Sequence, residues 1–201
     1  MPTHAHRRSA VGRPEATSHA VIERAAFELF AERGFDAVTM ADIAAEVGVS
    51  RRTLFRYFES KNDIPWGQFD LTLERFRTIL RALPQMLPVH EVVHRGVLEF
   101  NRFDETAAPP HRERMRLILE TPALQAHSVL RYAEWRAVVA EYVAERAGLD
   151  PHDALPETAG QVALALALSA YAIWLRSGAL TLEQRLAQSM VDLRTYLTVG
   201  P

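Results

Sequence analysis

The sequence predicts an all-α protein of about nine helices, and three observations support this. Apolar residues recur at helical spacing along the 201 residues, proline or glycine separates the apolar segments, and convincing strand alternation is confined to Ala163–Leu168. That stretch is rich in alanine, which favours a buried helix over a strand. We expect a small N-terminal domain of three helices, followed by a larger C-terminal helical domain.

The composition is that of an ordinary globular protein, with 48% hydrophobic and 24% charged residues. The chain has no cysteine, which excludes a disulfide framework, an iron–sulfur site and a cysteine-type zinc site. The N-terminal residues lack the apolar core of a secretory signal, and the longest apolar stretch, Val162–Leu175, is shorter than the roughly 20 residues of a membrane span. We therefore expect a cytoplasmic protein with no membrane partner and no cofactor.

The chain is expected to begin with a flexible basic arm, residues 1–14, that precedes the first helix. Thr17 or Ser18 can cap this helix, because either side chain can accept a hydrogen bond from a free backbone N–H of the first turn. The helix is expected to end at Arg33, since Gly34 occupies the position where glycine commonly terminates helices.

The next two helices are short and are separated by a tight turn. Thr39 can cap a helix over Met40–Val47 that ends at Gly48, and Ser50 can cap a third helix over Arg51–Phe58. A helix, a glycine-containing turn of about four residues and a second helix form the helix-turn-helix pattern of DNA-binding proteins. We therefore place a helix-turn-helix domain at residues 15–62.

The rest of the chain, residues 63–201, is expected to form a ligand-binding and dimerisation domain. Its first helix is predicted at about residues 63–83, with Pro65 in the first turn, where a missing N–H does no harm. Proline and glycine positions then predict helices at about residues 88–104, 110–120, 122–148, 153–177 and 181–198.

The positive charge is concentrated, although the net charge is only −2. Residues 50–61 carry four basic side chains against one acid, and residues 1–14 carry three arginines and no acid. On a helical wheel of the third helix, Leu54 and Phe58 share the inward side. Arg52, Phe55 and Arg56 then share the outward side, where guanidinium groups and an aromatic ring suit the edges of bases in a DNA major groove. The alternative is a solvated helix face.

Other residues near this helix are expected to hold the DNA backbone. Thr39, Tyr57 and Lys61 offer groups for phosphates, the helix N-termini at Thr39 and Ser50 favour anions, and Arg13 could reach the adjacent minor groove. Tyr57 could instead be a half-buried packing residue. The residues expected to contact DNA are Arg13, Thr39, Ser50, Arg51, Arg52, Thr53, Phe55, Arg56, Tyr57 and Lys61.

The segment AAFELFAERGFDAVTMADIAAEVGVSRRTLFRYFESKNDI closely resembles the N-terminal domain of TetR-family transcriptional regulators. The resemblance covers about residues 13–65, and Phe55 stands where the family often has a tyrosine hydroxyl. The matching residues are Phe30, Gly34, Phe35, Thr39, Ile43, Ala44, Gly48, Val49, Ser50, Thr53, Leu54, Tyr57, Phe58, Ser60 and Lys61. The extension FRYFESKNDIPWGQFD is similar to the subgroup of these regulators that is associated with mycofactocin gene clusters.

This resemblance implies a homodimer that binds a palindromic double-stranded DNA operator, usually as a repressor. It also implies that a small-molecule effector, bound in the C-terminal domain, releases the dimer from the DNA. It also implies an apolar or amphipathic effector, with an acyl-coenzyme A as the suggestion for the mycofactocin-associated subgroup. The residues themselves leave open a second possibility, a DNA-binding protein that acts architecturally without a ligand.

His90, Glu91 and His94 form the H-E-x-x-H pattern of zinc metallopeptidases, in which two histidines bind zinc and the glutamate is a general base. The alternatives are a structural or regulatory metal, or an ordinary polar side of a helix. No strand-rich lobe is predicted to bind a substrate, and Gly96 lies too close to His94 for the extended form of the motif. We expect no metal and no enzymatic activity.

Aromatic residues on the apolar faces of the middle helices are candidates for a ligand pocket between helices, although each could equally be core. Arg131, close to Trp135 in sequence, could meet an acidic ligand or form a surface salt bridge. The residues expected to bind the ligand are Phe76, Phe100, Phe103, Arg131, Trp135 and Tyr171.

The last two helices are expected to form the dimer. The helix that contains Val162–Leu175 is apolar nearly all round, and the last helix carries Leu186, Met190, Leu193 and Leu197 on one face. Pairing across a two-fold axis would give a four-helix bundle. The two recognition helices would then face successive major grooves, about 34 Å apart.

Overall fold

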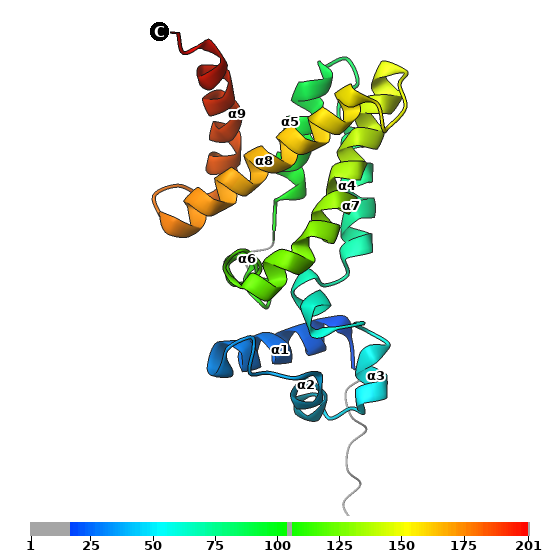
Figure 1. The fold of residues 1–201 in the computed structure, drawn as a ribbon, viewed down its shortest axis with the longest axis vertical. Coiled ribbons are helices and arrows are strands. Elements are labelled where there is room, and N and C mark those ends of the chain that lie inside the picture. Colours follow the sequence, from blue (N-terminus) through cyan, green and yellow to red (C-terminus); the bar gives the residue numbers. More distant parts are fainter. Residues whose placement is uncertain (1–16, 104–105, 201) are drawn as a thin grey trace, which may run out of the picture. The chain divides into compact units, whose positions relative to one another are not determined.

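The computed structural model describes residues 17–103 and 106–200, which form nine α-helices, one 3₁₀ helix and no strand (Figure 1). The all-α prediction is therefore confirmed. The chain divides into two compact units, of which the first ends at Glu59 and the second begins at Ser60. The predicted basic arm, residues 1–14, lies outside the described residues.

The first unit contains α1 (His19–Arg33), α2 (Met40–Glu46) and α3 (Arg51–Phe55). Ser18 caps α1 by accepting a hydrogen bond from the backbone N–H of Val21. Gly34 ends the helix at φ 80°, in a region of backbone conformation that favours glycine. The core of this unit includes Ile22, Ala26, Phe30, Ile43, Leu54 and Phe58, all at most 5% exposed.

The third helix is shorter than predicted. It ends at Phe55 instead of Phe58, and Arg56 is its C-cap. The backbone nevertheless continues to turn, because the N–H of Phe58 donates to the carbonyl of Leu54 (N···O 3.1 Å). Leu54 and Phe58 therefore still share the buried side.

The predicted continuous helix at residues 63–83 is wrong. The structure has a 3₁₀ helix, η1 (Lys61–Trp66), followed by α4 (Phe69–Ala82). Ser60 and Asp63 form a capping box that begins η1. Gly67 ends it at φ 60° and ψ −142°, a conformation that other residues rarely adopt and that separates η1 from α4.

The other helices of the second unit match the predicted segments closely. They are α5 (Val89–Phe100), α6 (His111–Glu120), α7 (Pro122–Ala147), α8 (Ala154–Arg176) and α9 (Leu182–Thr198). The alternating stretch Ala163–Leu168 is helical, as expected, and lies within α8.

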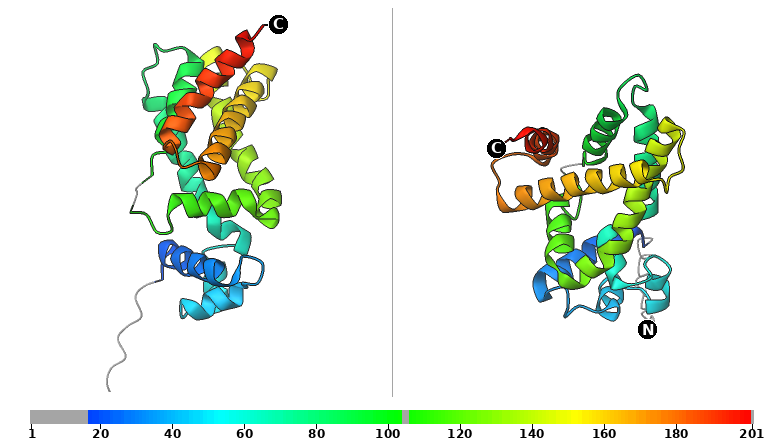
Figure 2. Two further views of the ribbon diagram at one scale, coloured as in Figure 1. Left: turned by 90° about the vertical axis from the view of Figure 1, so that its left-hand side faces the viewer. Right: turned by 45° about the horizontal axis from the view of Figure 1, so that its top comes forward.

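Two further views of the ribbon show how the helices of the second unit pack (Figure 2). α7 and α8 share the largest contact, α9 packs on α8 and α5, and α4 packs on α5 and α7. By length and hydropathy α8 could cross a membrane, but the core helix of a soluble protein passes the same test. Only 33% of its most apolar window is buried, so α8 also leaves an apolar face exposed.

Candidate nucleic-acid interface and effector cavity

The outward side of α3 combines positive charge with an exposed aromatic ring. Arg52 and Arg56 are exposed, and Phe55 is 42% exposed, whereas Leu54 is fully buried and Phe58 is 3% exposed. The first unit thus holds the helix through Leu54 and Phe58 and leaves the three outward side chains in solvent. Guanidinium forks with an aromatic edge between them match the donor and acceptor pattern of a major groove.

The hydroxyl groups at the helix starts belong to caps. Ser50 accepts a hydrogen bond from the N–H of Thr53 (3.1 Å), and the two side-chain oxygens lie 2.9 Å apart. Thr39 donates through its hydroxyl (2.6 Å) and its backbone N–H (2.8 Å) to the Asp42 carboxylate, and these bonds lower the pKa of Asp42. Ser50 and Thr39 are exposed and Thr53 is partly buried, so solvent reaches all three hydroxyl-bearing residues.

Tyr57 packs within the first unit. Its hydroxyl donates to the carbonyl of Thr17 (2.7 Å), and its ring contacts the edge of the His19 ring at 4.9 Å between centroids. These contacts agree with the alternative in which Tyr57 is a half-buried packing residue. Because an ionised phosphate only accepts hydrogen bonds, a phosphate contact would need this hydroxyl to give it the proton that Thr17 now accepts.

The remaining residues expected at DNA are distributed over the chain. Arg51 is exposed at the start of α3. Lys61 is the first residue of η1 and belongs to the second unit. Arg13 lies outside the described residues.

The second unit begins with a clamp that we define as Asp63, Arg114, His127 and Arg131. The Asp63 carboxylate accepts hydrogen bonds from Arg131 and from His127 of α7, both at 2.9 Å. Arg114 of α6 donates to the carbonyl of Pro65 (2.7 Å). Burial would raise the pKa of Asp63, but hydrogen bonds from Ser60 and Arg131 and the electrostatic effect of His127 and Arg131 lower it overall. The clamp thus joins η1 to α6 and α7.

The six residues expected to bind a ligand fall into three places. Phe76, Phe100 and Trp135 lie in the core, with the rings of Phe76 and Trp135 stacked at 5.0 Å. Phe103 stacks on His111, which is also hydrogen-bonded to Tyr171. Arg131 belongs to the clamp described above.

His111 and Tyr171 form a polar cluster with Asn101, in which Tyr171 is buried and the other two residues are partly buried. The Tyr171 hydroxyl donates to Asn101 Oδ1, so it accepts from Nε2 of His111 at 2.8 Å. Burial and the charge of Arg114 lower the pKa of His111 to about 3, and burial raises the pKa of Tyr171 above its usual range. Both side chains are therefore neutral at physiological pH.

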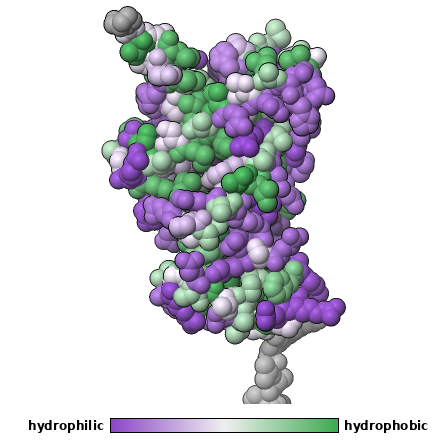
Figure 3. Space-filling view, viewed as in Figure 1, coloured by the Kyte–Doolittle hydropathy of each residue, from purple (hydrophilic) through white to green (hydrophobic). Residues whose placement is uncertain are grey.

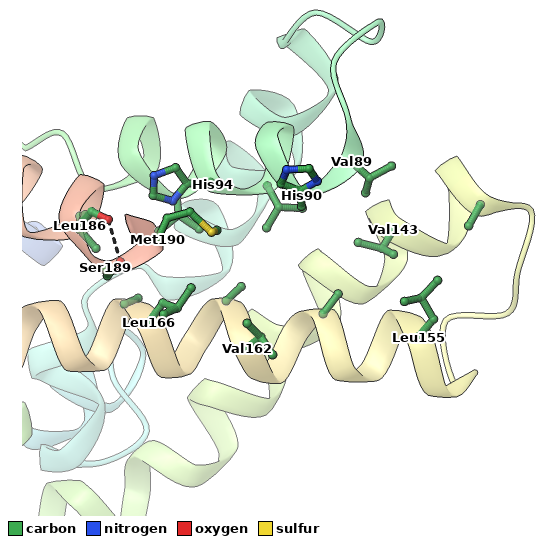
Figure 4. Close-up of a pocket in the computed structure, with 16 residues that line it drawn as sticks. Val89, His90, His94, Val143, Leu155, Val162, Leu166, Leu186, Ser189 and Met190 are labelled. Atoms are coloured by element: carbon green, nitrogen blue, oxygen red, sulfur yellow. Dashed lines mark hydrogen bonds between the residues drawn. The ribbon is translucent and has the colours of Figure 1, made fainter. Parts of the chain in front are cut away.

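A cavity of about 300 Å³ lies between α5, α7, α8 and α9, and Figure 4 shows its lining. The lining is almost entirely aliphatic, with Val93, Ala163 and Leu186 as examples. None of the six residues expected to bind a ligand lines it. A cavity of this size and apolar character is at the lower end of the range for small-molecule sites.

Sequence reasoning missed His90 and His94 as cavity residues. Both histidines point toward the same space from α5, one helical turn apart (Figure 4). Glu91 is instead paired with Arg95 on the same helix. Within residues 17–103 and 106–200, no group of three histidine or acidic residues could hold a metal. The signal that could have found them was the spacing of the H-E-x-x-H pattern, with both histidines on one helix face.

Comparisons with known proteins support the two units separately. Residues 22–64 match the family described as bacterial regulatory proteins, tetR family. Residues 87–198 match the family described as the MftR C-terminal domain. The chain is 44% identical over 178 residues to the mycofactocin biosynthesis transcriptional regulator MftR of Mycobacterium tuberculosis, covering 89% of this chain and 90% of that protein.

Solved structures with a similar fold come from other bacteria. The TetR-family repressor FadR of Thermus thermophilus, in complex with lauroyl-CoA, is 22% identical with a TM-score of 0.56, and the match covers 92% of this chain and 97% of that one. A TetR-family regulator of Syntrophomonas wolfei is 17% identical with a TM-score of 0.63, covering 90% and 95%. These similarities support the fold.

Proposed function

Because the chain belongs to the TetR family of bacterial transcriptional regulators, with the C-terminal domain of MftR, we propose that it is a homodimeric repressor that a small apolar or amphipathic effector releases from a palindromic operator. The relatives are DNA-binding transcriptional regulators and not enzymes, which removes the metallopeptidase alternative at His90, Glu91 and His94. A regulator of this kind acts in the cytoplasm, where its DNA is.

The observation that carries the proposal is the division of α3 into a buried and an exposed side. Arg52, Phe55 and Arg56 reach solvent together from a helix anchored by Leu54 and Phe58. In the proposed complex the two arginines bond base edges, and Arg51 and Thr53 flank them. Lys61, Thr39 and Ser50 are proposed at phosphates, and Arg13 in the minor groove.

The exposed apolar side chains of α8 and α9 support a dimer. Apolar residues gather on the visible side of these helices (Figure 3). Leu186 is buried, whereas Val191, Tyr196 and Leu197, further along α9, are at least 50% exposed. We propose that a second copy covers them in a four-helix bundle, since a two-fold interface makes the same face complementary to itself.

The effector is proposed to be a molecule with a long apolar part, of which an acyl-coenzyme A is one candidate. The apolar cavity between α5, α7, α8 and α9 supports this, and the FadR structure contains lauroyl-CoA. The proposed signal passes along α7, which lines the cavity with Val143 and Ala147 and also carries the clamp residues His127 and Arg131. A displacement of α7 would pull on η1, which directly follows the first unit.

Selection of binding sites from random double-stranded DNA, followed by footprinting, tests the proposal. We expect an inverted repeat of about 15–25 base pairs, protected by two chains whose recognition helices lie roughly 34 Å apart. Size measurement by light scattering should give a dimer with and without DNA. Coating of DNA without a repeat, with a steep dependence on salt, would favour the ligand-independent architectural alternative.

A further inference from the structure

A second hollow, of about 210 Å³, lies between α8 and α9, and its lining is far more polar than that of the apolar cavity. One cation and one anion line it, and both belong to α9. Tyr196, which also lines it, is 76% exposed and is among the side chains that a second copy is proposed to cover. We define the polar groove as the surface lined by Ser169 and Ile173 of α8 and by Arg185, Asp192 and Tyr196 of α9.

The Arg185 side chain has hydrogen-bonding capacity that its own chain does not use. Its Nη2 donates to the hydroxyl of Ser177 (3.3 Å), at the end of α8, so the guanidinium group is drawn toward the start of α9. Its Nε is shielded from solvent and has no hydrogen-bond partner in the part of the chain that the structure describes. Among these same residues no carboxylate pairs with it. Arg185 therefore lacks an anion.

Asp192 lacks a cation in the same way. One of its oxygens accepts a hydrogen bond from Nε2 of Gln188, one turn earlier, at 3.0 Å, and no ion pair joins Asp192 to any residue of 17–103 or 106–200. Arg185 does not fill this role within one chain, because it lies seven residues earlier, about 10 Å along the helix axis. Its bond to Ser177 also draws the guanidinium group in the opposite direction.

A second copy that covers the polar groove would remove water from both charges. A charge that loses its water without gaining a partner is strongly destabilising, so the covered cation and anion must each meet an opposite charge. In a two-fold interface, residue i of one copy meets residue j of the other, and j also meets i. Cross-pairing of Arg185 and Asp192 therefore satisfies both charges at once, whereas each residue facing its own copy would place like charges together.

Building on the dimer of the proposed function, we propose that the polar groove selects the partner subunit, because Arg185 of each subunit pairs with Asp192 of the other. The two ion pairs make this surface complementary to a second copy of the chain and repel a surface with the wrong charge at either position. Arg185 and Asp192 are then specificity-determining residues for homodimer formation, while the exposed apolar side chains of α8 and α9 supply most of the buried area.

Charge reversal tests the pairing with two single variants and their mixture. Arg185→Glu and Asp192→Arg should each raise the dissociation constant of the dimer at least about tenfold, because each homodimer then has like charges at both contacts. An equimolar mixture should form almost only heterodimers, in which both contacts again join opposite charges, whereas random pairing would give heterodimers in about half of the dimers. Native mass spectrometry of isotope-labelled and unlabelled chains counts the species, and analytical ultracentrifugation gives the dissociation constants.

The double variant Arg185→Glu with Asp192→Arg distinguishes a lost contact from a damaged fold. It restores opposite charges in its own homodimer, so it should dimerise with nearly wild-type affinity and avoid wild-type chains. Arg194→Glu is the matched control, because the charge of Arg194 acts on His94 of α5 and its side chain does not line the polar groove. This control should pair freely with wild-type chains, and circular dichroism checks that every variant is folded.

The possible outcomes separate this inference from the proposed function. Free mixing of the two single variants, as dimers of wild-type affinity, would overturn the pairing and leave the proposed dimer standing. A folded double variant that remains a monomer would also overturn the pairing. If wild-type protein binds its operator as a monomer, the dimer of the proposed function and this inference are both overturned. Preferred heterodimers together with a rescued double variant would support both.

Discussion

In α3 the side chains proposed to read DNA stand next to the side chains that hold the helix, whereas around the cavity the proposed ligand contacts are themselves core residues. Leu54 is fully buried and Phe55 is 42% exposed, although they are neighbours in sequence. Ala163 and Leu186 line the cavity and are also at most 8% exposed. The proposed functions therefore depend on residues other than the core residues in the first unit, and on core residues themselves in the second.

The largest effect should come from Leu54→Ala. Comparing this variant with Phe55→Ala separates the residue that stabilises the helix from the neighbour that is proposed to contact DNA. Leu54→Ala should lower the free energy of unfolding of the first unit by about 2–5 kcal/mol, because a fully buried leucine leaves a cavity. Phe55→Ala should change stability by no more than about 0.5 kcal/mol, as exposed substitutions usually do. All three tryptophans lie in the second unit, so their fluorescence does not report on unfolding of the first. Hydrogen exchange of the α3 amides is therefore the measurement. A large loss of stability in Phe55→Ala would contradict the division of the helix.

Arg52→Ala and Arg56→Ala should each weaken operator binding by about 1–3 kcal/mol and relax the preference for sequence. Arg24→Ala, an exposed arginine of α1, is the control for general loss of charge. Fluorescence anisotropy with operator and with unrelated DNA measures both affinities. If the two α3 variants bind both DNAs like the Arg24 variant, α3 is not the reading helix.

Asp63→Asn should weaken the clamp, since the variant keeps hydrogen-bonding atoms but loses the charge opposite Arg131 and His127. We expect a stability loss of about 1.5–3 kcal/mol, the range for a hydrogen bond to a charged group. The effector concentration needed for DNA release should rise, while effector affinity measured without DNA stays the same. Glu134→Gln, which removes the exposed partner of Arg131, is the control. Unchanged release in Asp63→Asn would remove α7 from the signal route.

His111→Gln should change how stability depends on pH. The folded protein holds His111 at a pKa of about 3, and its usual value is 6.5, so between these values the unfolded chain binds a proton that the folded one excludes. Stability therefore falls as the pH drops from about 6.5, and the variant should lose less of it. Melting temperatures from pH 7.5 to pH 4 measure the difference. Parallel curves for both proteins would contradict the burial of a neutral imidazole.

The smallest effect is expected for Tyr57→Phe, which removes the hydroxyl bonded to Thr17. If this hydroxyl only packs the first unit, stability should fall by about 0.5–1.5 kcal/mol and operator affinity should follow that loss. If it also contacts a phosphate, affinity for all DNA should fall further than the stability does. Comparing the two measurements at one temperature separates packing from a DNA contact.

The first unit could be read from the sequence because its signals are local. Caps at Ser18, Thr39 and Ser50 and the glycine at position 34 mark helix ends within a few residues, and Leu54 and Phe58 reveal the inward side by spacing alone. The end of α3 was placed three residues too late, because its last turn tightens without any proline or glycine to mark it.

In the second unit the sequence predicted α5 to α9 closely, but it joined η1 and α4 into one helix and did not point to the lining of the cavity. Prolines located α5 to α8, but the break at Gly67 was missed because the apolar spacing continues from Ile64 to Phe69 across it. Whether an apolar residue faces a neighbour or an empty space depends on packing between helices distant in sequence. Val93 and Ala163 therefore look no different in sequence from Phe76, which lies in the packed core.

The capping box at Ser60 and Asp63 makes the start of η1 self-contained. Every bond of this box and of the clamp lies after Glu59, so a chimaera joined between Glu59 and Ser60 keeps all of them. The second unit, with its proposed effector site, could then be fused to the DNA-binding domain of another regulator. Such a hybrid would report the same small molecule through a different promoter.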